Sequence, residues 1–171
     1  MPRWTAPEYE NPLAVLFVWV SALLPWEVAY ATLSGPNVSV LFVRWPLFHL
    51  RRVTDLTSAG GSSTMVATSL GAYQYQGTTT MATGYLVWTV VSVVFLALLA
   101  FSVAFYLREE AVTARVRRPA RLVGATLLLT GIGYLVAAAA IYKTGFGGLH
   151  VPLGALFQLA FGAVLLTNDP A

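Results

Sequence analysis

The chain of 171 residues is 57% hydrophobic and only 10% charged, and its mean hydropathy is +0.70. These values exclude an ordinary soluble domain and indicate one compact membrane domain, residues 1–171. The net charge of +3 is small and the arginines are spread along the chain, which argues against a nucleic-acid-binding protein. Because cysteine is absent, disulfides, thiolate metal sites and iron–sulfur clusters are excluded as well.

Four apolar segments are long enough to cross a membrane as helices, since a hydrocarbon core of about 30 Å requires about 20 helical residues. We expect Pro25 to kink the first segment, because proline removes a hydrogen bond and crowds the preceding turn. Pro152 lies in the first turn of the last segment, where proline is tolerated. The predicted fold class is an all-α membrane protein with four transmembrane helices, at about 13–33, 85–107, 122–142 and 149–167.

The long segment 34–82 separates the first two predicted helices and carries strand patterns. Residues 38–45, VSVLFVRW, are mostly β-branched or aromatic, which is typical of a strand, and Pro46 is expected to end it. A second apolar run, 47–50, follows. We therefore expect a large outer loop with short β-strands that lie flat on the helix ends. Residues 64–76 fit a short surface helix and a strand equally well.

This outer loop is either a simple folded lid or a docking surface. In the second case its partner is another membrane or cell-surface protein, or a second copy of the chain. The candidate interaction residues are the large aromatic and basic side chains of the loop, namely Phe42, Trp45, Phe48, Arg51 and Arg52.

Arginine in the short loops predicts the orientation in the cell membrane. The inner loop 108–121 contains five arginines and is therefore assigned to the cytoplasm. Since four spans return the chain to the side where it started, both termini are expected in the cytoplasm. The loop 34–82 is then expected outside.

Glu27 is the most informative single residue, because a carboxylate inside a predicted span normally has a partner or a role. We expect a partly buried pair between Glu27 and Arg44, since the arginine fork binds a carboxylate through two hydrogen bonds. Two interpretations stay open: an anchor that ties the loop to the helices, or a carboxylate that handles protons or cations. The candidate polar cluster comprises Glu27, Arg44, His150 and Gln158.

The sequence contains no recognisable catalytic motif, and the spacing of His49 and His150 matches no haem or metal motif, so we expect no enzyme, cofactor or metal. The first functional hypothesis is a non-enzymatic assembly, accessory or adhesion subunit that acts through the outer loop. The alternative is a small transporter, channel or proton-handling protein centred on Glu27. A third hypothesis is a cofactor-binding subunit of a respiratory or light-driven complex.

The patterns SALLPWE at 21–27 and SVLFVRWPLF at 39–48 resemble a family of small haloarchaeal membrane proteins. In that family a first span ending in Leu-Pro-Trp precedes a short strand. The resemblance implies a four-span fold and carries no assigned activity. The single long outer loop is also similar to the claudin-type tetraspan plan, but the cysteine pair of that family is missing, so this similarity concerns architecture only.

Overall fold

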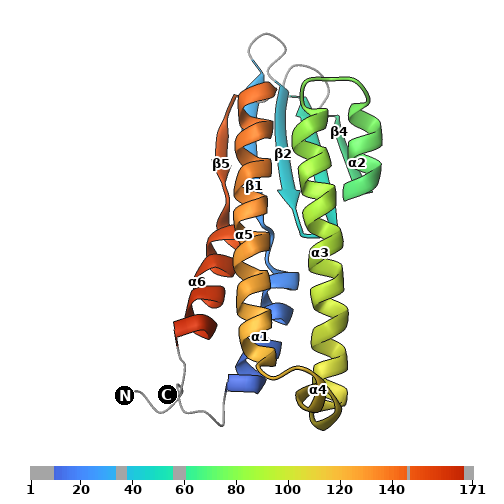
Figure 1. Ribbon diagram of the computed structural model, residues 1–171. Helices are drawn as coiled ribbons and strands as arrows, with labels where there is room; N and C mark the ends of the chain where they lie inside the picture. The colour runs from blue at the N-terminus through green and yellow to red at the C-terminus, as the bar shows by residue number, and fades with distance from the viewer. Residues whose placement is uncertain (1–9, 34–37, 56–60, 146, 168–171) are drawn as a thin grey trace.

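The computed structural model describes residues 10–33, 38–55, 61–145 and 147–167, which form six helices and five strands. Two long helices, α3 (Ala82–Leu107) and α5 (Pro119–Thr144), run side by side along an elongated molecule (Figure 1). A β-sheet and α2 pack on one half of this pair, which we call the sheet half. Helices α1 and α6 pack on the other half, the helical half, and the short helix α4 (Glu109–Arg115) closes its far end.

The prediction of four transmembrane helices is wrong. Among the described residues, only α3 and α5 are long and apolar enough to cross a membrane, and they contain the predicted segments 85–107 and 122–142. At 1.5 Å per residue, their 26 residues correspond to about 39 Å. Helix α1 (Glu10–Leu23) has 14 residues and α6 (Leu153–Thr167) has 15, so each reaches only about 21–23 Å.

The first predicted span changes from helix to strand at Pro25. Helix α1 ends two residues before this proline, and strand β1 (Glu27–Leu33) begins two residues after it. Proline lacks the N–H that would continue the helix, and β1 satisfies its backbone by pairing with strands on both sides. We predicted a kink in a continuous helix, but the structure shows the end of the helix.

The last predicted span is also divided into a strand and a helix, but here the strand comes before the helix. Residues Leu149–Val151 form strand β5 beside β1, and α6 follows after Pro152. The amide of Gly154 donates a hydrogen bond of 3.0 Å to the carbonyl of Pro25, which fixes the start of α6 against the end of α1. A Cβ at Gly154 would lie 2.5 Å from that carbonyl oxygen, so this approach requires glycine.

The strands form one antiparallel sheet in the order β4-β3-β2-β1-β5. The strands expected in the outer loop are present as β2 (Val38–Arg44) and β3 (Phe48–Asp55). The ambiguous segment 64–76 is partly strand and partly helix. It begins within β4 (Ser62–Thr68) and continues as α2 (Ser69–Gln76), with the Thr68 hydroxyl capping the helix by accepting from the amide of Gly71.

The sheet has an inner face toward the helices and an outer face away from them, because side chains alternate along each strand. The inner face of β1 and β2 is buried and contains Ala29, Ala31, Val40 and Phe42. It packs against the sheet half of α3 and α5, where Trp26, Trp88 and other large aromatic side chains form one core cluster. A second core cluster, which includes Val18, Phe95 and Leu127, fills the helical half.

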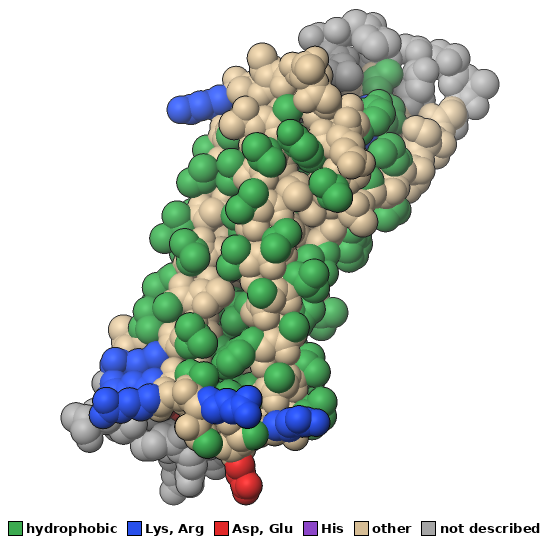
Figure 2. All heavy atoms as spheres, turned by 45° about the vertical axis from the view of Figure 1, so that its right-hand side comes forward, with side chains coloured by type: hydrophobic (Ala, Val, Ile, Leu, Met, Phe, Trp, Pro, Cys, Tyr) green, Lys and Arg blue, Asp and Glu red, His purple; other side chains and the backbone are tan. Residues whose placement is uncertain are grey.

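The surface changes along the long axis. Apolar side chains cover the flank of the molecule in the view of Figure 2, whereas most of the basic side chains visible there gather at the end that α4 occupies. The exposed arginines at this end are Arg108, Arg115, Arg117 and Arg118. The residues before 10 and after 167, on which the prediction of cytoplasmic termini rests, lie outside the described residues.

Candidate functional site

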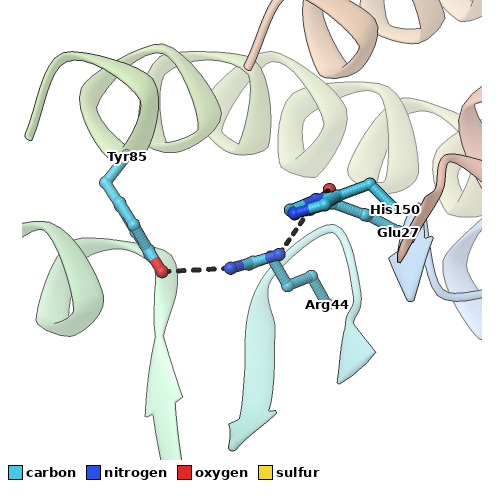
Figure 3. Close-up of polar contacts among 4 residues, drawn as sticks. All are labelled: Glu27, Arg44, Tyr85 and His150. Atoms are coloured by element: carbon cyan, nitrogen blue, oxygen red, sulfur yellow. Dashed lines mark hydrogen bonds and ion pairs between the residues drawn. The ribbon is translucent and has the colours of Figure 1, made fainter. Parts of the chain in front are cut away.

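Three strands bring ionisable side chains together at the end of the sheet nearest the helical half. Glu27, the first residue of β1, lies directly opposite Arg44, the last residue of β2. His150 of β5 pairs with Ala29, which is two residues from Glu27 and therefore on the same inner face. Tyr85 reaches this group from the first turns of α3 (Figure 3).

Glu27 accepts hydrogen bonds on both of its carboxylate oxygens. Arg44 Nη1 lies 2.5 Å from Glu27 Oε2, and His150 Nδ1 lies 2.6 Å from Glu27 Oε1. The other terminal nitrogen of Arg44 donates to the Tyr85 hydroxyl at 3.2 Å. Glu27 is 0% exposed and Arg44 is 1% exposed, so this ion pair is enclosed by protein.

The surroundings keep Arg44 cationic. Its guanidinium carbon lies 4.5 Å from the centre of the Phe42 ring and 5.7 Å from that of Tyr85, which places a cation over two aromatic faces. Burial by itself lowers the pKa of Arg44, but Tyr85 and Glu27 more than offset it, and the pKa lies above its ordinary value. Arg44 is therefore cationic, and Glu27 provides the carboxylate oxygen to which its Nη1 bonds.

His49 is a further buried ionisable residue, and it has no charged partner of this kind in the described part of the chain. It lies opposite Arg44 on β3 and is 4% exposed. Neither of its ring nitrogens has a hydrogen-bond partner among the described residues. Burial, with added repulsion from Arg44 and Arg51, lowers the pKa of His49 to about 4. His49 is therefore neutral at pH 7.

A cavity of about 200 Å³ adjoins these side chains, between the inner face of the sheet and helices α2, α3 and α5. The strands contribute Arg44, His49 and Arg51 to its wall, and α2 contributes Tyr75 and Gln76. The remaining lining residues are apolar or aromatic: Phe42, Met65, Ala72, Met81, Tyr85 and Ile141.

The structure brings together three of the four residues of the candidate polar cluster. Glu27, Arg44 and His150 are in contact, but Gln158 is not part of this group. Gln158 is fully buried in α6, and its side-chain oxygen accepts a hydrogen bond of 2.9 Å from Thr130 of α5. Glu27 itself lies in a strand and not, as predicted, inside a membrane helix.

The candidate interaction residues divide between the two faces of the sheet. Phe42 and Arg51 are on the inner face and line the cavity. Phe48 and Arg52 are exposed on the outer face. Trp45 lies in the β2–β3 turn, where it stacks on Phe48 with ring centres 4.9 Å apart and donates to the carbonyl of Leu23.

Sequence reasoning missed the roles of His49 and Tyr85. The period of two along β3 could have separated Arg51 from Arg52 and placed His49 on the same face as Arg51. Tyr85 and Arg44 are 41 residues apart in the chain, and their contact depends on how α3 packs on the sheet. No local sequence pattern therefore predicts it.

The arrangement provides hydrogen-bond donors and positive charge beside a partly open cavity with a largely apolar wall. No group of three or more His, Cys, Asp or Glu side chains that could hold a metal ion occurs in the part of the chain that the structure describes. The chemistry that the site offers is therefore recognition of a group that accepts hydrogen bonds and carries negative charge.

Fold and site together define a mixed α/β protein in which two long apolar helices carry an antiparallel sheet, with a buried ion pair at the junction. The chain belongs to the family DUF7549, a family of unknown function, whose model matches residues 3–170. A search of curated proteins finds no match to the chain.

We expect the Glu27–Arg44 pair to behave as one unit in stability measurements. Glu27→Gln and Arg44→Gln should each lower the free energy of unfolding by about 3–5 kcal/mol, because each leaves a buried partner uncompensated. The double variant should lose clearly less than the sum of the two. Denaturant unfolding of the four proteins measures this coupling, with exposed Glu110→Gln as a control that changes little. Additive losses would show that the pair is not coupled.

We also expect His49 to make the fold sensitive to acid. Its pKa is near 6.5 in the unfolded chain and about 4 in the folded protein, so the unfolded state binds more protons between these values. Stability should therefore fall as the pH is lowered from about 6.5 toward 4. Unfolding temperatures of wild type and His49→Gln across this range test the effect. The variant should lose part of the acid sensitivity, and identical pH profiles would contradict the assignment.

Proposed function

We propose that this protein is a non-enzymatic integral membrane protein, with its helical half in the bilayer and its sheet half outside. It acts as an assembly or accessory subunit, and it binds its partner protein through the outer face of the sheet. The observation that carries this proposal is a continuous apolar row on that outer face, next to the expected membrane boundary.

The apolar flank of α3 and α5 supports a membrane location. Large apolar side chains are exposed on α3 at Val90, Val93 and Leu96 and on α5 at Leu129 and Ile132. An exposed apolar surface that follows two helices over their length is unfavourable in water and favourable in lipid. The resemblance of residues 21–27 and 39–48 to small haloarchaeal membrane proteins points in the same direction.

The arginines at the α4 end indicate the depth of the protein in the bilayer. About 20 helical residues cross a hydrocarbon core of about 30 Å. Counted from Arg108, such a core ends near Trp88 in α3. Trp88 donates a hydrogen bond to the carbonyl of Pro46 in the β2–β3 turn, so the sheet begins at this level.

The sheet itself then lies beyond the hydrocarbon. This placement suits its two edge strands, β4 and β5, because unpaired backbone groups are not tolerated in lipid. By the preference of arginine for the cytoplasmic side, the α4 end faces the cytoplasm and the sheet faces outward.

The outer face of the sheet is graded in polarity along its strands. The row nearest the membrane contains only apolar side chains and crosses all five strands, in the order Val151, Val28, Val43, Leu50 and Val66. The row two residues further on is mixed and includes Tyr30 and Arg52. The last row consists of hydroxyl side chains: Thr32, Ser39, Thr54 and Ser62.

An apolar row of this kind supports a protein partner. Val66 is 64% exposed, and Leu149 and Tyr30 beside the row are also exposed. Exposed contiguous apolar surface on a sheet is costly unless another surface covers it. A second membrane protein standing beside the chain would reach this row directly above the bilayer.

The geometry of Glu27 favours a structural role over transport. Both carboxylate oxygens are engaged, by Arg44 and by His150. The helical half below contains an apolar cluster that includes Val18, Phe95 and Leu127. Its buried Gln158 bonds to Thr130 and not to Glu27. A proton- or ion-handling carboxylate needs access to water and a polar route, so we place Glu27 in the scaffold.

The apolar row can be tested with one charged residue on edge strand β4. We expect Val66→Asp to release the partner, because a carboxylate in an apolar interface is desolvated without compensation. Native mass measurement after gentle extraction from native membranes should show a complex for wild type and the single chain for the variant. Ser62→Asp, on the same strand and face but in the hydroxyl row, is the control and should keep the complex.

Both substitutions are at exposed positions, so unfolding temperatures should change little. A wild-type protein that is extracted as a single chain with bound lipid only would contradict the proposal. So would a Val66→Asp variant that keeps its full complex.

A further inference from the structure

We propose that the cavity on the inner face of the sheet binds a small anionic ligand, a carboxylate or phosphate group attached to an apolar body. The cavity lies on the opposite face of the sheet from the partner surface, so a failed test of the proposed function would leave this proposal intact. It rests on three polar side chains that line one partly open cavity, with donors that the fold leaves unused.

Several buried nitrogen atoms at the cavity have no hydrogen-bond partner in the part of the fold that the structure describes. Buried polar atoms in folded proteins almost always have partners. At this cavity, His49 Nδ1 and Nε2, Arg44 Nε and Arg51 Nε are all buried and have none among the described residues. His49 and Arg44 are each more than nine-tenths buried, so these atoms do not depend on bulk water. A ligand with several acceptor oxygens would satisfy these arginine donors and the single N–H of neutral His49.

The cavity wall also carries positive charge. The positive charge of Arg44 is balanced by Glu27, but Arg51 has no carboxylate beside it among the described residues that line the cavity. Arg51 is half-buried, and its guanidinium lies 5.8 Å from the centre of the Phe42 ring. A partly desolvated cation next to a cavity attracts an anion, because the low dielectric strengthens the interaction.

The rest of the cavity wall is largely apolar. Phe42 and Tyr85 present aromatic surface, and Met65, Met81 and Ile141 present aliphatic surface. Ligand pockets typically combine a largely apolar wall with a few convergent polar groups that fix orientation. The anionic group would therefore meet Arg51 and His49, and an apolar body would occupy the remaining space.

Arg51 and Arg52 provide a matched test within one strand. They are neighbours on β3, but Arg51 lines the cavity and Arg52 is exposed on the outer face. Substitution of either by glutamine removes one positive charge and keeps most of the side-chain length. A ligand in the cavity should depend on Arg51 alone, whereas general attraction to a basic protein should depend on both.

The experiment uses the full chain in nanodiscs and three probes: inorganic phosphate, benzoate and phosphatidylglycerol. The first two are titrated into nanodiscs of phosphatidylcholine, and the third replaces phosphatidylcholine in the disc. Tryptophan fluorescence reports binding, since Trp88 lies with its ring centre 5.6 Å from that of His49. The imidazole NMR signals of His49 give an independent readout, assigned by comparison with His49→Gln.

We expect at least one probe to saturate and to shift the His49 signals. Arg51→Gln should weaken that binding at least tenfold, and Arg52→Gln should leave it within twofold. Saturation by phosphate or benzoate identifies a soluble ligand, and saturation by phosphatidylglycerol alone identifies a lipid headgroup. The inference is overturned if no probe moves the His49 signals, or if both arginine variants weaken binding equally.

Discussion

The carboxylate of Glu27 holds three strands and one helix in a single arrangement. It is fully buried, and an unpaired charge in such a position would cost several kcal/mol. Arg44 and His150 must therefore approach it, and Arg44 in turn reaches Tyr85 on α3. These contacts fix the register of β1 against β2, the position of β5, and the height of the sheet on the long helices. A one-residue slip of β1 would turn Glu27 to the outer face and leave Arg44 unpaired.

This junction explains how two different halves form one protein. The helical half is held by apolar packing and by close approach of α5 to α6, where a Cβ at Gly162 would lie 2.7 Å from the carbonyl oxygen of Gly124. The sheet half is held by backbone pairing and by the ion pair. Chain segments cross between the halves at Pro25, where helix changes to strand, and at Pro152, where strand changes to helix. In our proposal the membrane boundary lies at the level of these two prolines. The chain then changes between helix and strand where its surroundings change between lipid and water.

Much of the local structure was predictable from the sequence, whereas the fold was not. The long helices α3 and α5 follow from unbroken apolar length, and β2 follows from its β-branched residues. Hydropathy alone cannot distinguish a membrane helix from a helix followed by a buried strand, and it therefore predicts a helix for residues 27–33. Pairing partners decided their conformation: β1 needs β2 and β5 on its two sides. The interaction of Glu27 with Arg44 was expected from the cost of a buried charge, but the cavity around His49 depends on tertiary packing alone.

The position of the molecule in the membrane is the central claim of this account, and the absence of cysteine from the chain makes it directly measurable. Single cysteines at Thr64, Leu96 and Arg117 mark the sheet, the middle of α3 and the α4 end. With intact cells and a maleimide that cannot cross membranes, we predict that Thr64→Cys reacts and that Arg117→Cys reacts only after permeabilisation. Leu96→Cys should stay unreactive until the protein is unfolded. Reaction of Leu96→Cys in intact cells as fast as that of Thr64→Cys would contradict the account.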